Sequence, residues 1–351
     1  MTSTPFSPRA LDLASGTVEL VHGAGGRASA QLIEDLFARA FDNPVLRQGD
    51  DGAVILPPGL GGGPLVMATD AHVVSPLFFP GGDIGSLSVH GTVNDVAVMG
   101  ARPLWLAAAF VLEEGFPLAD LARIVASMAE AARSAGVAIV TGDTKVVEKG
   151  KGDGVFITTT GLGVRLPGVE VGGSRARPGD AVLVSGPVGD HGMAILGQRE
   201  NLAFESPIRS DTAALNGLVE AVLQAVPAMR VLRDPTRGGL ATTLNEIARQ
   251  SGVGFALEEA SIPVREGVAA ACEFLGLDPL YSPCEGRLVA VCAEADAGAA
   301  LAALRAHPLG REAARIGSAV EDPHRFVTLR TGLGGQRIVD WLAGEQLPRI
   351  C

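Results

Sequence analysis

The terminal Cys351 is the residue whose position most suggests chemistry. It ends the segment 347–351, Leu-Pro-Arg-Ile-Cys, so its thiol is either part of a frayed terminus or a group that the chain delivers to another site. Pro348 stiffens the tail, and Ile350 offers an apolar contact for its tip. Arg349 favours the thiolate through its positive charge, whereas the α-carboxylate of Cys351 opposes it. We predict that Cys351 is catalytic and that Arg349 and Ile350 contact the protein or a partner.

Five carboxylates in the first half of the chain share a setting, because each lies at the end of an apolar segment or beside glycine or asparagine. They are Asp50, Asp51, Asp70, Asp95 and Asp143. Any one of them is more simply explained as the cap of a turn or a helix. Five together, beside a glycine-rich segment, favour a Mg²⁺ site, because Mg²⁺ prefers hard oxygen ligands and usually bridges to phosphates.

The glycine-rich segment 22–26, His-Gly-Ala-Gly-Gly, precedes a predicted helix over 28–41. Backbone N–H groups and the helix dipole converge at such an N-terminus and bind anions, although glycine-rich turns before helices are common. The segment lacks the Gly-Lys-Ser/Thr ending of a Walker loop, so together with the carboxylates it predicts a magnesium–nucleotide site outside the Walker class. The predicted nucleotide contacts are His22, Gly23, Gly25, Gly26, Asp51, Asp70, Asn94, Asp95, Asp143 and Thr144.

Four further residues are candidates because of their neighbours. Lysine is rare in this chain, and Lys145 follows a Gly-Asp-Thr segment; its compact ammonium suits phosphate binding or proton transfer. Glu285, in a Cys-Glu-Gly turn, is the candidate general base. Arg237 and His191 lie near helix starts and are candidate contacts of a phosphate or of the tail. The structural alternatives are an ion pair with Asp143 for Lys145, a turn residue for Glu285, and ordinary ion-pair or backbone contacts for the other two.

The elements that must position these residues alternate between strands and helices, which predicts an α/β (α+β) fold. Strands are predicted over 17–21, 65–69, 104–112, 137–141, 155–164, 181–185, 253–257, 288–292 and 314–320, and a hairpin over 326–330 and 337–341. Helices are predicted over 28–41, 81–100, 117–135, 211–226, 234–250, 263–275 and 295–306, and one more begins near 189.

Length and composition set the remaining limits. A chain of 351 residues predicts about two domains, and the Gly-, Pro- and Arg-rich stretch 165–179 marks their boundary. We expect an ATP-binding and dimerisation domain over 1–165, an α/β domain over 166–335, and a final strand with a mobile tail over 336–351. The net charge of −11 argues against nucleic acid as a partner. The chain shows no membrane-length apolar run, no signal peptide and no C-x-x-C pair, so we expect a cytoplasmic protein that does not bind membranes.

Ten segments of the sequence resemble the aminoimidazole-ribonucleotide-synthetase superfamily, and in particular its hydrogenase-maturation carbamoyl dehydratases. Six match the superfamily's ATP-binding half: 22–26, 50–53, 69–70, 77–82, 91–100 and 141–146. Four more narrow the resemblance to the dehydratases: 190–192, 234–239, 285–286 and 348–351. The motifs occur in the family's order over nearly the whole chain.

The resemblance implies a homodimer in which strands of both N-terminal domains form a shared barrel, with ATP and Mg²⁺ bound near it. It implies that a HypF-type carbamoyltransferase loads Cys351 with a carboxamide. ATP-dependent dehydration would then leave an S-cyanide, which passes to a HypC–HypD complex and becomes a cyanide ligand of the nickel–iron hydrogenase iron.

One position departs from the family, because Cys284 stands where an asparagine is usual before the glutamate. Glu285 itself is retained, so it remains the candidate base. A thiol hydrogen-bonds only weakly, so Cys284 is a poor substitute for any orienting function of the asparagine side chain. Two other interpretations stay open at this point. One is a different ATP-using member of the superfamily, such as a selenophosphate synthetase or a thiamine-phosphate kinase. The other is a nucleotide-sensing maturation scaffold without catalysis.

Overall fold

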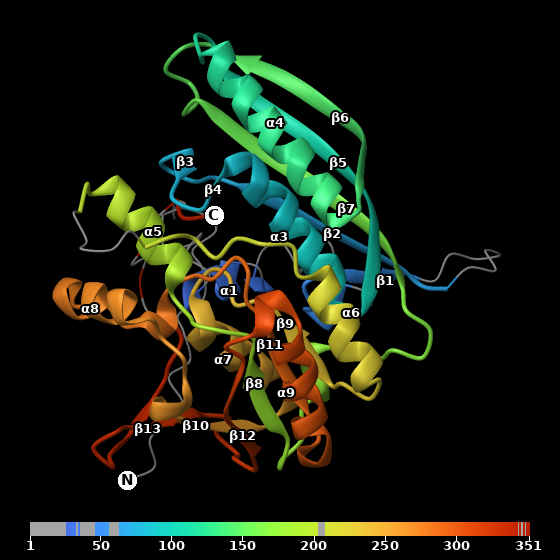
Figure 1. Cartoon of the computed structure of the whole chain (residues 1–351), viewed down its shortest axis with the longest axis vertical. Helices are drawn as coiled ribbons and strands as arrows, with labels where there is room; N and C mark the ends of the chain where they lie inside the picture. Colours follow the sequence, from blue (N-terminus) through green and yellow to red (C-terminus); the bar gives the residue numbers. More distant parts are fainter. Residues whose placement is uncertain are drawn as a thin grey trace.

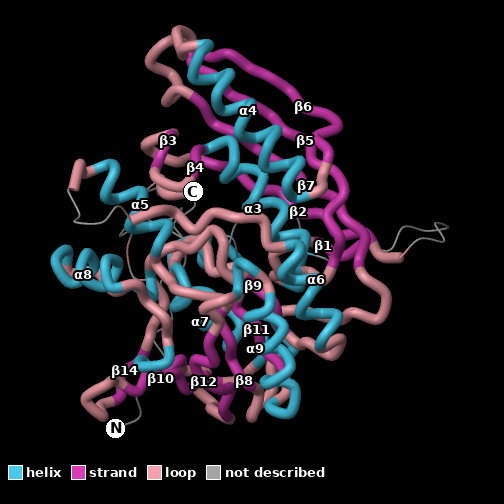
Figure 2. Tube along the Cα trace, in the orientation of Figure 1, coloured by secondary structure: helices cyan, strands magenta, loops and turns pink. Residues whose placement is uncertain are grey.

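The computed structural model describes residues 26–32, 34–35, 46–55, 63–202, 208–342, 344, 347 and 349–351. The predicted strand over 17–21 lies outside these residues, as do His22, Gly23 and Gly25 of the glycine-rich segment. The described chain folds into two large sheets with helices packed on them (Figure 1), and Figure 2 shows the two regions by secondary structure. The predicted α/β class is confirmed.

A five-stranded sheet forms from the first half of the chain, in the order β1-β2-β7-β5-β6. Neighbouring strands are antiparallel except β5 and β6, which are parallel. Helices α3 and α4 pack against this sheet and against each other (Figure 1). The bounds are β1 Ala53–Ile55, β2 Leu65–His72, α3 Ile84–Val98, β5 Ala101–Glu113, α4 Leu118–Ala135, β6 Ala138–Val147 and β7 Val155–Arg165.

The ends of α3 and α4 follow ordinary sequence signals. The short hairpin of β3 (Phe78–Phe79) and β4 (Gly82–Asp83) leads into α3. There the Asp83 side chain accepts a hydrogen bond from the Ser86 N–H, and the Ser86 hydroxyl accepts one from the Asp83 N–H. Helix α4 ends at Gly136, whose φ of 72° is left-handed and favours glycine.

The second half forms a seven-stranded sheet in the order β14-β13-β10-β12-β8-β11-β9. Its central strands are buried on both faces. Val182 and Val184 of β8 pack into the cluster that includes helix α7, whereas Ala181 and Leu183 pack into the cluster with α6 and α9. The bounds are β8 Ala181–Val184, α5 Asp190–Arg199, α6 Asn216–Ala225, β9 Val231–Arg233, α7 Gly239–Ser251, β10 Gly254–Glu258, α8 Glu266–Leu275, β11 Val289–Cys292, α9 Ala297–Ala306, β12 Ala314–Val320, β13 Val327–Arg330 and β14 Gln336–Ile338.

Several predicted bounds were wrong. Strand β6 does not end at residue 141 but continues to Val147, so the Gly-Asp-Thr-Lys segment lies inside the strand. Gly142 belongs there because a Cβ atom on it would lie 2.1 Å from the Ala108 carbonyl oxygen of β5. The helix predicted over 211–226 begins only at Asn216, and residues 208–215 have no regular secondary structure. Strands β1 and β9 were not predicted, because each has only three residues.

Within the described residues, no helix is both long and apolar enough to span a membrane. Helix α1 (Arg27–Leu32) covers the start of the helix predicted over 28–41, and residues 36–45 lie outside the described part of the chain.

Candidate functional site

The C-terminal tail rests against the segment that follows β2. The Val73 N–H donates to the Cys351 carbonyl oxygen at 2.9 Å, and the Ser75 N–H donates to the Arg349 carbonyl oxygen at 3.1 Å. Val74 and Ile350 thereby form an antiparallel β-bridge. The tail is thus held inward by backbone hydrogen bonds as well as by its side chains.

The side chains of the tail are bound too. Ile350 is only 3% exposed and belongs to the core cluster of α3, α4 and the five-stranded sheet. Arg349 forms an ion pair with Asp153, and the Arg199 guanidinium donates to the carbonyl oxygens of Ser75 at 2.8 Å and of Arg349 at 2.7 Å. These contacts fix the direction in which the terminal residue enters the protein.

His191, at the start of α5, contacts the tail directly. Its Nε2 lies 2.7 Å from the Ile350 carbonyl oxygen, and its Nδ1 lies 2.8 Å from the Ser210 hydroxyl. Because burial lowers the pKa of His191, the ring is neutral near pH 7. A carbonyl oxygen only accepts, so Nε2 carries the proton and the Ser210 hydroxyl donates to Nδ1.

Docking brings the Cys351 thiol beside Arg237, Glu285 and Asp70. Burial raises the pKa of the thiol; the positive charge of Arg237 opposes this rise, and the carboxylates of Glu285 and Asp70 add to it. Arg237 keeps an exposed surface, so water partly screens its charge. The docked thiol is therefore protonated near neutral pH and suits a carrier of an acyl group better than a nucleophile.

Glu285 is 2% exposed and lies in the turn before β11. Burial first, and then the nearby carboxylates of Asp234 and Asp70, raise its pKa well above the ordinary value. Its Oε1 atom has no hydrogen-bond partner among the described residues. A raised pKa favours the protonated carboxyl group, so a nearby cation is needed to ionise it. Once ionised, a buried carboxylate with a raised pKa and a free oxygen is a strong proton acceptor and suits a general base.

Three of the predicted metal ligands, Asp51, Asp70 and Asp95, interact electrostatically with one another and with Asp234. Burial raises the pKa of Asp95 well above its ordinary value, and the other three carboxylates raise it further. Burial and the same neighbours raise the pKa of Asp234 to about 8. One oxygen each of Asp51 and Asp234 has no hydrogen-bond partner in the described structure. A bound cation would reduce the electrostatic repulsion between these carboxylates.

Arg233, on β9, supplies the positive charge of this region. It is buried, forms ion pairs with Asp51 and Glu246, and thereby ties the loop before β1 to α7. Asp50 lies next to this pair, but its carboxylate accepts a hydrogen bond from the Gly173 N–H at 2.8 Å. Burial raises the pKa of Asp50 overall.

Asp143 and Lys145 do not join the cluster within this chain. Both lie on the exposed strand β6, where the Lys145 ammonium is 2.7 Å from the Asp143 carboxylate. Across the described residues, no group of three or more His, Cys, Asp or Glu side chains is close enough to hold a metal ion. The predicted convergence of five carboxylates is therefore absent from the described part of a single subunit.

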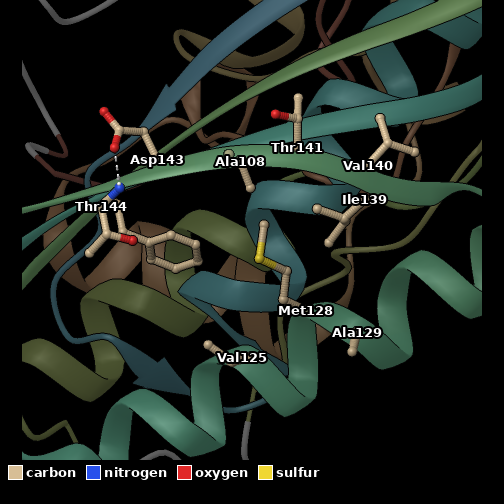
Figure 3. A pocket seen from close by; sticks show the side chains of 11 residues that line it. Ala108, Val125, Met128, Ala129, Ile139, Val140, Thr141, Asp143 and Thr144 are labelled. Atoms are coloured by element: carbon tan, nitrogen blue, oxygen red, sulfur yellow. Dashed lines mark hydrogen bonds between the residues drawn. The ribbon is translucent and has the colours of Figure 1, made fainter.

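A hollow of about 760 Å³ lies between α4 and strands β5 and β6 (Figure 3). Asp143, Thr144 and Met128 line it, together with small and apolar side chains. The Thr144 N–H donates to its neighbour Asp143 at 2.8 Å. Among the described residues, none of the tail and none of the second half of the chain lines this hollow.

The remaining predicted nucleotide contacts have structural partners. Asn94 is fully buried; its amide donates to the carbonyl oxygens of Ala213 and Glu285 and accepts from the Leu215 N–H at 2.7 Å. Both N–H donors of the Asn94 amide thus bind backbone carbonyl oxygens and are not available to a ligand. Gly26 packs against Leu342, where a Cβ atom would lie 2.3 Å from the carbonyl oxygen.

The sequence did not single out Asp234, Arg233, Asp211 or Arg199. Asp234 opens the segment 234–239, which was interpreted as a helix start and as part of the resemblance, with no function predicted for Asp234 itself. An acidic residue directly after a short apolar strand was the available signal, but that strand, β9, was itself missed. The other three take part through contacts distant in sequence, for which no local signal exists.

Comparison with known proteins places the chain in a family. The family models described as "AIR synthase related protein, N-terminal domain" and "AIR synthase related protein, C-terminal domain" match residues 49–165 and 177–330. The carbamoyl dehydratase HypE of Cupriavidus necator is 68% identical over 343 residues, which cover 98% of this chain and 97% of that protein.

Two solved structures are similar over most of the chain. One, of HypE in complex with ATP, has a TM-score of 0.80 and 54% identity and covers 95% of this chain and 100% of that chain. The other, of a HypE–HypF complex, has a TM-score of 0.83 and 51% identity and covers 88% of this chain and 99% of that chain. The chain therefore belongs to the HypE family of carbamoyl dehydratases, within the AIR synthase related proteins.

Proposed function

We propose that this protein uses ATP to dehydrate a carboxamide carried on the sulfur of Cys351 to an S-cyanide. The observation that carries the proposal is the docked tail, which holds the thiol beside Arg237, Glu285 and Asp70. The cyanide would supply ligands of the nickel–iron hydrogenase iron, as expected for a hydrogenase-maturation dehydratase. Membership of the HypE family sets aside the selenophosphate synthetase and thiamine-phosphate kinase interpretations.

The reaction balances when the carboxamide oxygen leaves as part of phosphate. The oxygen attacks the γ-phosphorus of ATP and ADP departs; two protons then leave the amide nitrogen while the C–O bond breaks to release phosphate and form the nitrile. Glu285 would take a proton from nitrogen; the support is that its Oε1 has no hydrogen-bond partner in the described structure and that its charge acts on the Cys351 thiol. Arg237 would stabilise negative charge on the oxygen, which its electrostatic interaction with Cys351 supports.

We propose Mg²⁺ as the cation of this site. The fit rests on Asp51, Asp70, Asp95 and Asp234, whose oxygens repel one another and of which two have no hydrogen-bond partner. Magnesium is commonly held by one or two carboxylates together with substrate phosphates and water, so a complete protein cage is not required. When bound, it would neutralise charge on the phosphates. Asp50 is the least suited of the predicted ligands, since Gly173 already occupies one of its oxygens.

We propose a homodimer formed through the face of the five-stranded sheet that carries exposed apolar side chains. Val140 and Val146 of the edge strand β6 are 59% and 67% exposed, and Trp105 of β5 is 45% exposed. An edge strand with such side chains favours pairing with a second copy. A shared barrel would bring Asp143, Thr144 and Lys145 of one subunit towards the ATP site of the other. Light scattering of the purified protein would show a monomer if this is wrong.

We propose the domain division 1–165, 166–335 and 336–351, which the matched regions 49–165 and 177–330 support. The proposed partners are a HypF-type carbamoyltransferase and a HypC–HypD acceptor, in the cytoplasm. The solved HypE–HypF complex, at 51% identity, supports the first partner. Gly26 stays a proposed phosphate contact together with His22, Gly23 and Gly25, which lie outside the described residues.

Mass spectrometry of the C-terminal peptide tests the function. The carbamoyltransferase and carbamoyl phosphate should add a carboxamide to Cys351, and Mg-ATP should then remove one water. Cys351→Ala should take up no label. Glu285→Gln should load normally and dehydrate at least about 100-fold more slowly, as expected for a lost general base. Loading without any ATP-dependent loss of water would support the non-catalytic scaffold instead.

A further inference from the structure

Residues 208–215 form an irregular segment before α6, here called the strap, and Asp211 is its most buried charged residue. We propose that Asp211 is a positioning residue for Glu285. The proposal rests on the proposed function, because it takes Glu285 to be the general base. It concerns how the chain orients the carboxyl group of that base. It rests on contacts between residues far apart in the sequence, which no local sequence pattern predicts.

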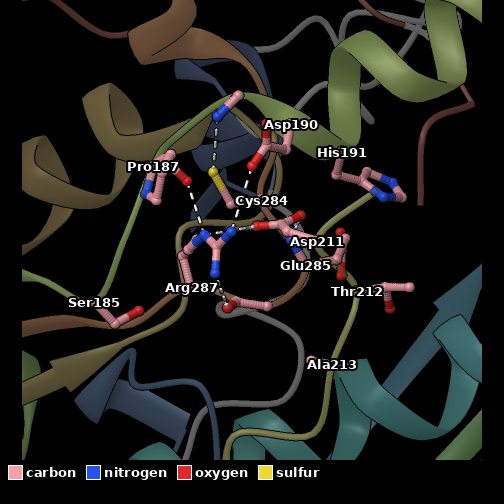
Figure 4. Close-up of polar contacts among 12 residues, drawn as sticks. Ser185, Pro187, Asp190, His191, Asp211, Thr212, Ala213, Cys284, Glu285 and Arg287 are labelled. Atoms are coloured by element: carbon pink, nitrogen blue, oxygen red, sulfur yellow. Dashed lines mark hydrogen bonds and ion pairs between the residues drawn. The ribbon is translucent and has the colours of Figure 1, made fainter. Parts of the chain in front are cut away.

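The strap holds the backbone of Glu285 on both sides (Figure 4). The Glu285 N–H donates to Asp211 Oδ1 at 3.1 Å, and the Ala213 N–H donates to the Glu285 carbonyl oxygen at 3.3 Å. The approach is so close that a Cβ atom on Gly286 would lie 1.8 Å from the Asp211 carbonyl oxygen. Only glycine fits at 286, so the turn and the strap are one packed unit.

Asp211 is itself fixed by charge. Its side chain is 0% exposed, and its Oδ2 lies 3.4 Å from Nε of Arg287. The Arg287 guanidinium also lies 3.3 Å from Asp190, which pairs in turn with Arg265 at 3.1 Å. Figure 4 shows the guanidinium between the two carboxylates. A buried carboxylate with this partner is held in one place, and loss of the pairing would leave a costly buried charge.

The side chain of Glu285 has no comparable support. Its Oε1 has no hydrogen-bond partner in the described structure, so the direction of the carboxyl group depends on how its backbone is held. Asn94 of α3 adds to that support through its 3.4 Å hydrogen bond to the Glu285 carbonyl oxygen. Asp211 accepts a hydrogen bond from the main chain of Glu285, and its charge raises the pKa of the Glu285 carboxyl group. Because Asp211 acts through Glu285, it is a positioning and not a catalytic residue.

The same strap also contacts the docked tail through one intermediate. The Thr212 N–H donates to the Ser210 hydroxyl at 3.1 Å, and that hydroxyl donates to His191 Nδ1. His191 Nε2 then donates to the Ile350 carbonyl oxygen. A continuous hydrogen-bonded chain thus runs from the tail to the residue next to Asp211, so the thiol carrier and the base are positioned by one segment.

The experiment compares Asp211→Ala, Asp211→Asn, Glu285→Gln and the double variant Asp211→Ala/Glu285→Gln in the full-length protein. Tails are first loaded by the carbamoyltransferase, and loss of water is then followed in a single turnover with Mg-ATP. Asn keeps the oxygen that accepts from the Glu285 N–H, whereas Ala removes it. Loading and ATP binding report whether each variant is folded.

We expect Asp211→Ala to slow dehydration at least about 10-fold, with loading and ATP affinity unchanged, because small misplacements of a base cost that much or more. Asp211→Asn should recover most of the rate. The double variant should be no slower than Glu285→Gln alone, because Asp211 acts through Glu285. A wild-type rate for Asp211→Ala, or losses that multiply in the double variant, would overturn the proposal. If Glu285→Gln alone dehydrates at the wild-type rate, Glu285 is not the general base, and the proposed function of Glu285 is overturned before that of Asp211 is tested.

Discussion

At the scale of single residues, the docked Cys351 thiol has the properties of a substrate carrier and not of a reactive nucleophile. Burial raises its pKa, so it stays protonated at pH values where a free cysteine ionises. In the ligand-free protein, iodoacetamide should therefore modify Cys351 at least about 10-fold more slowly than the same thiol in the unfolded chain at pH 8.5. Peptide mapping measures both rates. Ile350→Ala should speed modification, because it removes the buried anchor of the tail; equal rates for native and unfolded protein would contradict inward docking.

A buried histidine gives a second residue-scale prediction. Burial lowers the pKa of His90 to about 4, and its Nδ1 bonds the Thr212 hydroxyl of the strap at 3.0 Å. Since the folded pKa is below the unfolded value, His90 lowers stability as the pH falls from about 6.5 towards 4, by about 2–3 kcal/mol in total.

Urea unfolding at several pH values measures this loss. His90→Asn, which keeps an acceptor for Thr212 and does not titrate, should flatten the stability curve over this window. His324→Asn at an exposed site is the control and should leave the slope unchanged. The same slope in His90→Asn and wild type would show that other groups cause the acid loss.

The residues that the sequence could identify differ from those it could not. The tail, Glu285 and the aspartates near Asp70 stood out because of local motifs, and the structure brings several of them together. Asp211 and Arg233 act through partners far away in the chain, at positions 285 and 51. Their importance depends on burial and on long-range pairing, which no local pattern contains.

At the scale of elements, strands and helices with strong periodicity or clear caps were predicted nearly correctly, as for α3 and α4. The errors fall where tertiary contacts override local signals. Glycine and aspartate within 142–145 indicated a turn, but parallel pairing with β5 extends β6 through them. Residues 211–215 of the strap were assigned to a helix, yet the backbone of the strap is hydrogen-bonded to Glu285 and to Pro80.

Gly142 offers a test of this element. Gly142→Ala should lower the free energy of unfolding by about 1–3 kcal/mol, because its Cβ atom would overlap the Ala108 carbonyl oxygen and the strands would have to separate. Gly298→Ala is the matched control: it lies in α9 with nothing within 4 Å of the added Cβ atom, so it should be neutral or stabilise by up to about 1 kcal/mol. Urea denaturation compares them. Equal effects would show that β5 and β6 are not closely paired at Gly142.

At the scale of the whole molecule, one subunit does not bring all the proposed catalytic groups together. The tail, Arg237 and Glu285 lie close together within this chain, whereas Lys145 lies on the exposed β6 and pairs with Asp143. Exposed apolar side chains on the same strand favour a subunit interface there. The proposed dimer therefore explains how Lys145 would reach the site: it would be supplied by the second subunit.

Mixed dimers test this arrangement. Lys145→Ala and Glu285→Gln should each slow dehydration at least about 100-fold in a homodimer. In a dimer with one subunit of each kind, one site would lack both groups and the other would keep both, because a two-fold axis exchanges the contributions. Random mixing should thus restore about a quarter of the wild-type rate, since half the dimers are mixed and each has one intact site. Differently tagged subunits purified in sequence would isolate the mixed species. Its failure to dehydrate loaded tails would place Lys145 and Glu285 in the same subunit's site, whereas a wild-type rate for the Lys145→Ala homodimer would remove Lys145 from the reaction.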